Sequence, residues 1–175
     1  MTIQLKNRVL TRTKIQARIH ELAKSILNDY QDKELVVIGV LKGAFIVTAD
    51  LVRALEDIRI IIDFIQVSSY GQSQTSSGTV KIIKDIAIDI KDKHVLLVED
   101  ILDTGVTIDS IVNRLKKEHP KSIKIFCLID NQKRRKMSVP VDYIGFSVKS
   151  GFLVGYGLDY QDNYRQLQDI YELSE

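Results

Sequence analysis

The sequence predicts an α/β protein with one mainly parallel, twisted sheet flanked by helices. Short uninterrupted apolar runs recur along the chain, as in strands buried on both faces. Between residues 35 and 129, segments with apolar residues at helical spacing separate these runs. Such alternation predicts right-handed crossovers and therefore parallel strands. A length of 175 residues, 45% of them apolar and 27% charged, suits a single soluble domain over residues 1–175.

The first half of the chain begins with a helix and a strand. Apolar residues at helical spacing predict an amphipathic helix over residues 12–30. The run at residues 35–40 predicts a buried strand, and a second helix follows residues 41–44. Residues 58–68 are rich in Ile, Phe and Val, which predicts another strand.

A polar stretch, residues 69–79, interrupts this order. It contains one aromatic residue and no aliphatic residue before residue 80, so it buries too little surface to become ordered. Strand patterns at residues 60–67 and 79–84 bound it. An ordinary surface loop is one interpretation. The other is the mobile tip of a hairpin, placed to exclude water from an active site.

Residues 95–107 contain the main candidate site residues. An apolar strand is expected to end abruptly at the acids Glu99 and Asp100, and a small-residue turn then leads into a helix with one apolar stripe. The first amides of that helix lack internal partners, so they suit a phosphate. Carboxylates beside an anion site fit a ligand that also offers hydroxyls or carries a divalent metal. Taken alone, a solvated acidic loop and an ordinary helix start explain the pattern equally well.

The second half of the chain completes the predicted sheet. Residues 122–129 predict a buried strand, and residues 141–148 predict a further one. The N-terminal arm and the segments after residue 151 are expected to form a small cap over the carboxyl edge of the sheet.

Bulk properties disfavour several classes of protein. A net charge of +2 gives no support to a nucleic-acid partner, and the apolar runs are too short to cross a membrane. The first residues lack the apolar block of a signal peptide. The single cysteine, Cys127, lies in an apolar strand pattern, which predicts a buried thiol and a reducing, cytoplasmic location.

Residues 95–107 resemble the phosphoribosyl-pyrophosphate signature of the type I phosphoribosyltransferases. Further matches occur in the order seen in hypoxanthine-guanine phosphoribosyltransferases: residues 41–43, 69–70, 152–156 and 159–160, with Arg165. The resemblance covers roughly residues 8–173. It implies a purine salvage enzyme in which N9 of hypoxanthine or guanine attacks C1 of phosphoribosyl pyrophosphate. IMP or GMP and pyrophosphate are the products, and Mg²⁺ is required.

The resemblance implies roles for the residues that follow the central strand. Asp103 is the general base or acid at purine N7; from the residues alone, a helix N-cap is the alternative. Glu99 and Asp100 hold the ribose hydroxyls, directly or through metal-bound water. The 5′-phosphate cradle comprises Asp103, Thr104, Gly105, Val106 and Thr107.

The same resemblance implies a pyrophosphate site and a metal site. Lys42 and Gly43 contact pyrophosphate, with a cis peptide bond preceding the lysine, and Arg165 contributes its planar donor fork. The Mg²⁺ ligands are Asp159, Glu99 and Asp100. Ser69 and Tyr70 belong to the lid.

The purine site departs from the family pattern at one position. Phe152 stacks on the base, Ile101 packs on its other side, and Leu153 offers backbone groups. The family places a lysine that donates to the purine O6 where this chain has Asn131. An amide donates to an oxo group and also accepts from an amino group, so discrimination against adenine is expected to weaken unless Lys133 reaches the base.

Two alternatives and one open property remain at this point. Asn131 leaves room for a xanthine or other-base phosphoribosyltransferase. A non-catalytic, nucleotide-sensing regulator of the same fold is the second alternative, and the low net charge, the short length and Asp103 disfavour it. Because relatives form dimers or tetramers, a homodimer or homotetramer is expected.

Overall fold

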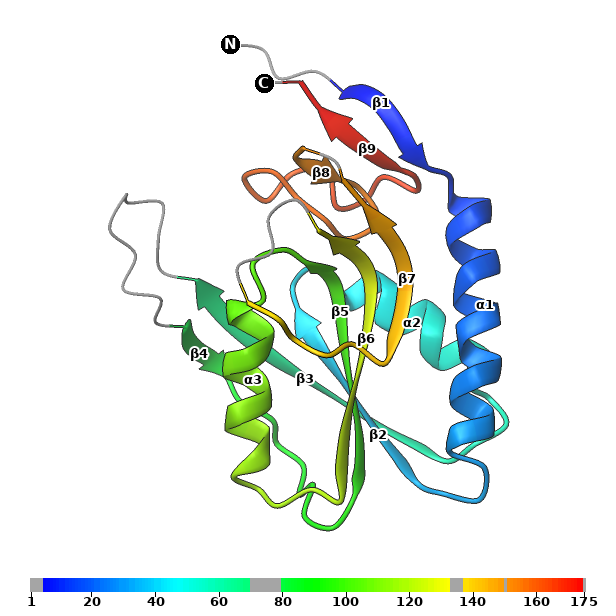
Figure 1. Cartoon of the computed structure of the whole chain (residues 1–175), viewed down its shortest axis with the longest axis vertical. Coiled ribbons are helices and arrows are strands. Elements are labelled where there is room, and N and C mark those ends of the chain that lie inside the picture. The colour runs from blue at the N-terminus through cyan, green and yellow to red at the C-terminus, as the bar shows by residue number, and fades with distance from the viewer. Residues whose placement is uncertain (1–4, 70–79, 133–136, 150, 175) are drawn as a thin grey trace.

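The computed structural model describes residues 5–69, 80–132, 137–149 and 151–174 (Figure 1). A six-stranded sheet occupies its centre, formed by β2 (Leu35–Leu41), β3 (Ile60–Ser69), β4 (Val80–Lys84), β5 (His94–Leu102), β6 (Ser122–Asn131) and β7 (Tyr143–Val148). Its order is β4-β3-β2-β5-β6-β7. Neighbours are parallel except for β4, which runs antiparallel to β3. The predicted α/β fold with a mainly parallel sheet is confirmed.

Helices cover both faces of this sheet. The crossovers from β2 to β3 and from β5 to β6 run in opposite directions along the sheet. Right-handed crossovers therefore place α2 (Phe45–Ala54) and α3 (Val106–Lys116) on opposite faces. The first helix, α1 (Arg12–Asp29), packs beside α2. Its N-cap is Thr11, whose hydroxyl accepts from the Lys14 amide, and its buried residues match the predicted apolar stripe.

Two strands extend further than the sequence predicted. The strand β5 does not end at the acids; it continues through Glu99 and Asp100, and Glu99 pairs with Cys127 of β6. Similarly, β6 continues past residue 129 to Asn131, which pairs with Val148. The polar side chains of Glu99 and Asn131 suggested that the strands end there. Their backbone groups nevertheless pair with the neighbouring strand, so the strands continue. Both extensions carry polar side chains into the interior.

A second, three-stranded sheet forms the predicted cap. It contains β1 (Leu5–Leu10), β8 (Leu153–Val154) and β9 (Ile170–Leu173) in the antiparallel order β1-β9-β8. Figure 1 shows it beyond the carboxyl ends of β5, β6 and β7. Asp169 ties the two ends of the chain together, because its carboxylate accepts from the Arg12 amide at 2.7 Å and pairs with Arg8 at 3.2 Å.

The predicted hairpin is present as the antiparallel pair β3 and β4, with Ser69 opposite Val80. The lid prediction falls largely outside the described residues, because Tyr70 and residues 71–79 are not described, nor is the side chain of Ser69. Cys127 is buried, as predicted. Among the helices described, none has the length and apolar character needed to cross a membrane.

Asp63 organises the base of this hairpin. Its carboxylate accepts from the amides of Phe64 at 2.7 Å and Ala87 at 2.6 Å, and from Lys84 Nζ at 3.2 Å. Burial raises the pKa of Asp63, but these amides and the Lys84 ammonium outweigh it and lower the pKa below its usual value.

We expect Asp63→Asn to lower the free energy of unfolding by about 1–2 kcal/mol at pH 7, because the variant loses charge-assisted hydrogen bonds. Because the pKa of Asp63 is lower in the folded than in the unfolded protein, its ionised carboxylate stabilises the fold at any pH above the unfolded pKa. This stabilisation is lost as the pH falls through the folded pKa. Urea unfolding at pH 7 and near pH 3 measures both effects. The exposed Asp57→Asn variant is the control, and equal losses in the two variants at pH 7 would contradict the prediction.

Candidate active site

The predicted site residues meet at the carboxyl edge of the central sheet. Lys42 and Gly43 follow β2, Glu99 and Asp100 lie near the end of β5, and Asn131 ends β6. The loop between β8 and β9, residues 155–169, covers this edge (Figure 1). Ligands of open α/β sheets bind at such an edge.

Two buried carboxylates form the floor of the site. Glu99 and Asp100 are each only 7% exposed. Burial raises the pKa of Glu99 well above its usual value, and the neighbouring charge of Asp100 raises it further. Burial also raises the pKa of Asp100, against the opposing effect of its contact with Glu99. Two acids this close and this buried favour a ligand that brings hydroxyl donors or a cation.

A turn whose helix start suits an anion follows these acids, and we call it the anion-binding turn. Gly105 is the N-cap of α3 and has φ +89°, a left-handed conformation that favours glycine. The N-cap alternative for Asp103 is therefore wrong. A cavity of about 120 Å³ opens at this helix start, lined by Glu99, Asp100, Ile101, Leu102, Asp103, Thr104, Gly105, Thr107 and Ile108. Val106 is the first residue of α3 and does not line it.

A second cavity, of about 140 Å³, adjoins the first. Its lining residues are Asp100, Ile101, Asp103, Asn131, Gly151, Phe152, Leu153, Leu158 and Asp159. Asp103 therefore lies between the anion-binding turn and this second cavity. Phe152 is 40% exposed, and its ring meets that of Tyr160 edge-on at 5.5 Å, so it presents an aromatic surface rather than filling the core.

Asn131 lies deep in the second cavity and is only 1% exposed. Among the described residues that line this cavity there is no lysine or arginine. Lys133, the other residue predicted to reach the base, falls outside the described residues. The polar side chain that β6 contributes to this cavity is therefore a neutral amide.

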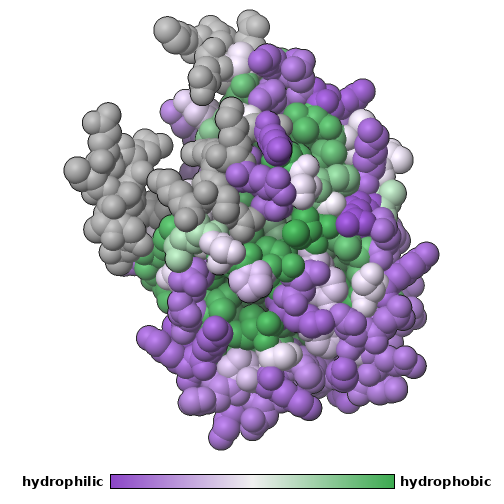
Figure 2. Space-filling view, in the orientation of Figure 1, coloured by the Kyte–Doolittle hydropathy of each residue, from purple (hydrophilic) through white to green (hydrophobic). Residues whose placement is uncertain are grey.

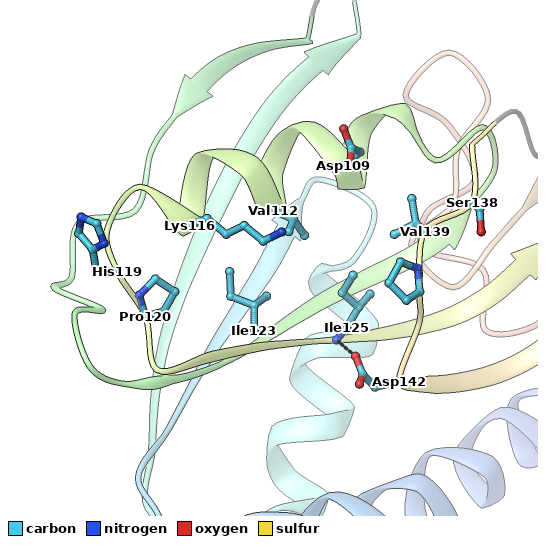
Figure 3. Close-up of a pocket in the computed structure, with 11 residues that line it drawn as sticks. Asp109, Val112, Lys116, His119, Pro120, Ile123, Ile125, Ser138, Val139 and Asp142 are labelled. Carbon is cyan, nitrogen blue, oxygen red and sulfur yellow. Dashed lines mark hydrogen bonds between the residues drawn. The ribbon is translucent and has the colours of Figure 1, made fainter.

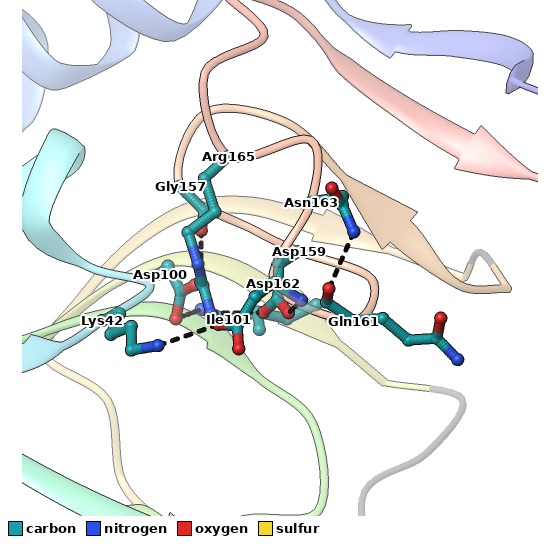
Figure 4. Close-up of polar contacts among 9 residues, drawn as sticks. All are labelled: Lys42, Asp100, Ile101, Gly157, Asp159, Gln161, Asp162, Asn163 and Arg165. Carbon is teal, nitrogen blue, oxygen red and sulfur yellow. Dashed lines mark hydrogen bonds and ion pairs between the residues drawn. The ribbon is translucent and has the colours of Figure 1, made fainter.

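The cationic side of the site is built by Lys42 and Arg165 (Figure 4). The peptide bond between Leu41 and Lys42 is cis, as predicted. Arg165 Nη1 donates to the Gly157 carbonyl at 2.7 Å, and Nη2 lies 2.7 Å from Asp159 Oδ1. Lys42 Nζ lies 2.9 Å from Asp162 Oδ1. Hydrogen bonds from Lys42 and then Arg165 lower the pKa of Asp162.

Close backbone approaches fix the position of Lys42 and its neighbours. A Cβ added to Gly43 would lie 1.9 Å from Asp100 Oδ2. A Cβ added to Gly157, whose φ is +100°, would lie 2.1 Å from the Gly43 carbonyl oxygen. Only glycine fits at position 157, where the backbone is left-handed and the neighbour is a carbonyl, and any side chain at position 43 would displace the Asp100 carboxylate. The loop after β2, the end of β5 and the β8–β9 loop are therefore in direct contact.

Two contacts that hold the site together could not be found from the sequence. The Gly157 contact is one, although two glycines around Tyr156 in the sequence are a signal of an unusual backbone. The other is the hydrogen bond that Tyr156 Oη donates to Asp50 of α2, which anchors the β8–β9 loop to the helix after Lys42. Burial, and then this bond, raise the pKa of Tyr156.

The carboxylates fit a Mg²⁺ site that is shared with a ligand. Within the described parts of the chain, no three His, Cys, Asp or Glu side chains come together as a protein-only metal site. Mg²⁺ commonly keeps several waters and binds one or two carboxylates together with substrate phosphates. Asp159 and Asp100 line the same cavity, which suits that mode of binding.

A larger cavity lies elsewhere. Figure 2 shows hydrophobic residues gathered on the face between α3 and α1, and a cavity of about 560 Å³ lies between α3 and β6. Figure 3 shows its lining, which includes Val112, Ile123 and Asp142. Asp142 is engaged there by the Ile125 amide at 2.8 Å. None of the predicted site residues that the structure describes lines this cavity.

Comparison with known proteins gives consistent matches. The family model of the phosphoribosyl transferase domain matches residues 7–161. The hypoxanthine-guanine phosphoribosyltransferase of Aquifex aeolicus is 48% identical over 92% of this chain and 90% of its own length. The hypoxanthine phosphoribosyltransferase of Escherichia coli is 42% identical over 93% and 92%. The crystal structure of a hypoxanthine phosphoribosyltransferase from Staphylococcus aureus superposes with a TM-score of 0.92, at 42% identity, over 97% of this chain and 92% of that one.

The Gly157 contact predicts a specific loss of stability. Gly157→Ala is expected to lower the free energy of unfolding by roughly 2–3 kcal/mol, because the new Cβ meets a carbonyl oxygen and the backbone is left-handed. Gly151→Ala is the matched control, since its Cβ would meet only the flexible end of Glu172. Chemical unfolding measures both, and a Gly157 variant no less stable than the control would refute the contact.

Proposed function

Because this chain is an enzyme of the phosphoribosyl transferase family, we propose that it acts in purine salvage. It transfers the 5-phosphoribosyl group from phosphoribosyl pyrophosphate to N9 of hypoxanthine or guanine, giving IMP or GMP and pyrophosphate. One observation carries this proposal: Asp100 and Asp103 line both the cavity at the start of α3 and the cavity beside Phe152. A sugar phosphate and a base held in the two cavities would meet at these carboxylates.

The sugar phosphate is bound by the anion-binding turn and the buried acids. Its 5′-phosphate accepts hydrogen bonds from the first amides of α3 and from the hydroxyls of Thr104 and Thr107. The ribose hydroxyls donate to Glu99 and Asp100, which gives the buried pair the partners it favours. The pyrophosphate group points toward Lys42 and Arg165, which lie near Asp100.

The base occupies the second cavity. Phe152 stacks on the purine, Ile101 packs on its opposite face, and Leu153 offers backbone groups. As the N9 lone pair forms the bond to C1, the bond from C1 to the pyrophosphate oxygen breaks and its electron pair leaves with pyrophosphate. Asp103 takes the proton from N7, so that the product base is neutral.

Three further features belong to this proposal. Bound Mg²⁺, held by Asp159, Glu99 and Asp100, would offset the negative charge of the pyrophosphate group. Ser69 and Tyr70, in the lid, would exclude water while C1 carries positive charge. A cytoplasmic location and a homodimer or homotetramer complete it.

Removing the proton acceptor tests the mechanism. Asp103→Asn is expected to lower kcat by about 10²–10⁴-fold with hypoxanthine, because an amide cannot take the N7 proton. Pyrophosphate release with phosphoribosyl pyrophosphate and Mg²⁺ measures it, and the exposed Asp92→Asn, at the opposite edge of the sheet, serves as control. An Asp103 variant with wild-type turnover would rule out this role.

Asn131 favours a second candidate, a phosphoribosyltransferase with relaxed base preference, because its amide can pair with an oxo or an amino group. We expect Asn131→Ala to lower kcat/KM for oxopurines more than Lys133→Ala does. A panel of hypoxanthine, guanine, xanthine, adenine and uracil measures the preference directly. Greater damage from the Lys133 variant would show that Asn131 does not occupy the position facing the purine 6-substituent.

A further inference from the structure

The two cations of the site share one carboxylate. Asp162 Oδ1 lies 2.9 Å from Lys42 Nζ and 3.3 Å from Arg165 Nη2 (Figure 4). Lys42 follows β2, whereas Asp162 and Arg165 lie in the β8–β9 loop. The carboxylate therefore stands between two positive groups brought together from distant parts of the chain.

The backbone of the β8–β9 loop aims this carboxylate. Asp162 and the preceding Gln161 have φ of 61° and 51°, a conformation that most residues avoid. The Asp162 amide donates to Asp159 Oδ2 at 2.8 Å. The amides of Tyr160 and Asn163 each donate to the other residue's carbonyl, at 3.2 and 3.0 Å. This narrow turn fixes the direction in which the Asp162 side chain leaves the chain.

The contact of Asp162 with Lys42 and Arg165 is exposed to water, so another anion can take the place of its carboxylate. The side chain of Asp162 is 70% exposed and that of Lys42 is 56% exposed. Ion pairs this exposed contribute little to stability, so a stronger anion can replace one partner at small cost. Arg165 has two further contacts, to Gly157 and Asp159, that hold it in place without Asp162.

We propose that Asp162 sets the affinity of the pyrophosphate subsite, because its carboxylate competes with pyrophosphate for Lys42 and Arg165. The inference rests on the proposed function, since it takes these two cations as pyrophosphate ligands. Pyrophosphate carries more charge than one carboxylate and offers more oxygens, so it displaces Asp162 when it binds. The competition weakens binding and speeds the departure of the product.

Asp162→Asn tests this role with little change of shape, because asparagine also tolerates the left-handed backbone. We expect the dissociation constant for inorganic pyrophosphate, measured by titration calorimetry with excess Mg²⁺, to fall about two- to five-fold. The KM for phosphoribosyl pyrophosphate is expected to fall with it. The difference from wild type should shrink at high salt, because screening weakens exposed charges.

Two variants serve as controls. Asp162→Glu keeps the charge and should bind pyrophosphate nearly as wild type does. Asp32→Asn removes an exposed aspartate with φ 60° at the opposite edge of the sheet, and should leave binding unchanged.

The outcomes separate the two proposals. If wild type binds pyrophosphate but Asp162→Asn binds it no more tightly, or more weakly, the carboxylate positions the cations rather than competing for them, and this inference alone fails. If wild type neither binds pyrophosphate nor releases it from phosphoribosyl pyrophosphate with any purine, the proposed function fails as well.

Discussion

The close contact of three backbone segments around Gly43 is the constraint on which the site depends. Gly43 packs against the Asp100 carboxylate, and Gly157 packs against the Gly43 carbonyl. No side chain larger than hydrogen fits at Gly43 or Gly157 without displacing a neighbour, so the loop after β2, the end of β5 and the β8–β9 loop are held in direct contact. The bond from Tyr156 to Asp50 anchors the third segment to α2. The cations, the buried acids and the β8–β9 loop are therefore placed relative to one another by close packing around Gly43.

The charges of the site follow from this arrangement. Buried carboxylates lie on the floor, a helix start provides amides for an anion, and two cations lie on the third side. Each group is costly or exchangeable by itself. Burial raises the pKa of both Glu99 and Asp100, and Lys42 and Arg165 take the exposed Asp162 carboxylate as partner. A ligand with hydroxyls, phosphates and a divalent metal satisfies all of them together.

Much of this fold follows from periodicity, and the site residues follow from local motifs. The helix over residues 12–29 and the strands of the central sheet were predictable because apolar spacing reports burial directly. The cap was expected only in outline, because β1 is mostly exposed and gives no such spacing. The ends of β5 and β6 were not, because Glu99 and Asn131 look like surface residues until their neighbours in space are known. The contacts of Tyr156 with Asp50 and of Asp162 with Lys42 join residues more than a hundred positions apart. No spacing rule reports such pairs.

The most direct test of this constraint is the rate of pyrophosphate release from phosphoribosyl pyrophosphate and hypoxanthine by a Gly43→Ala variant. Its added methyl group would overlap the Asp100 carboxylate, so the loop and this carboxylate must move apart. Displacement of about 1 Å can cost roughly 10²-fold in rate, and we expect kcat/KM to fall at least that far in protein that still unfolds cooperatively. A folded Gly43→Ala variant with wild-type kcat/KM would contradict the account.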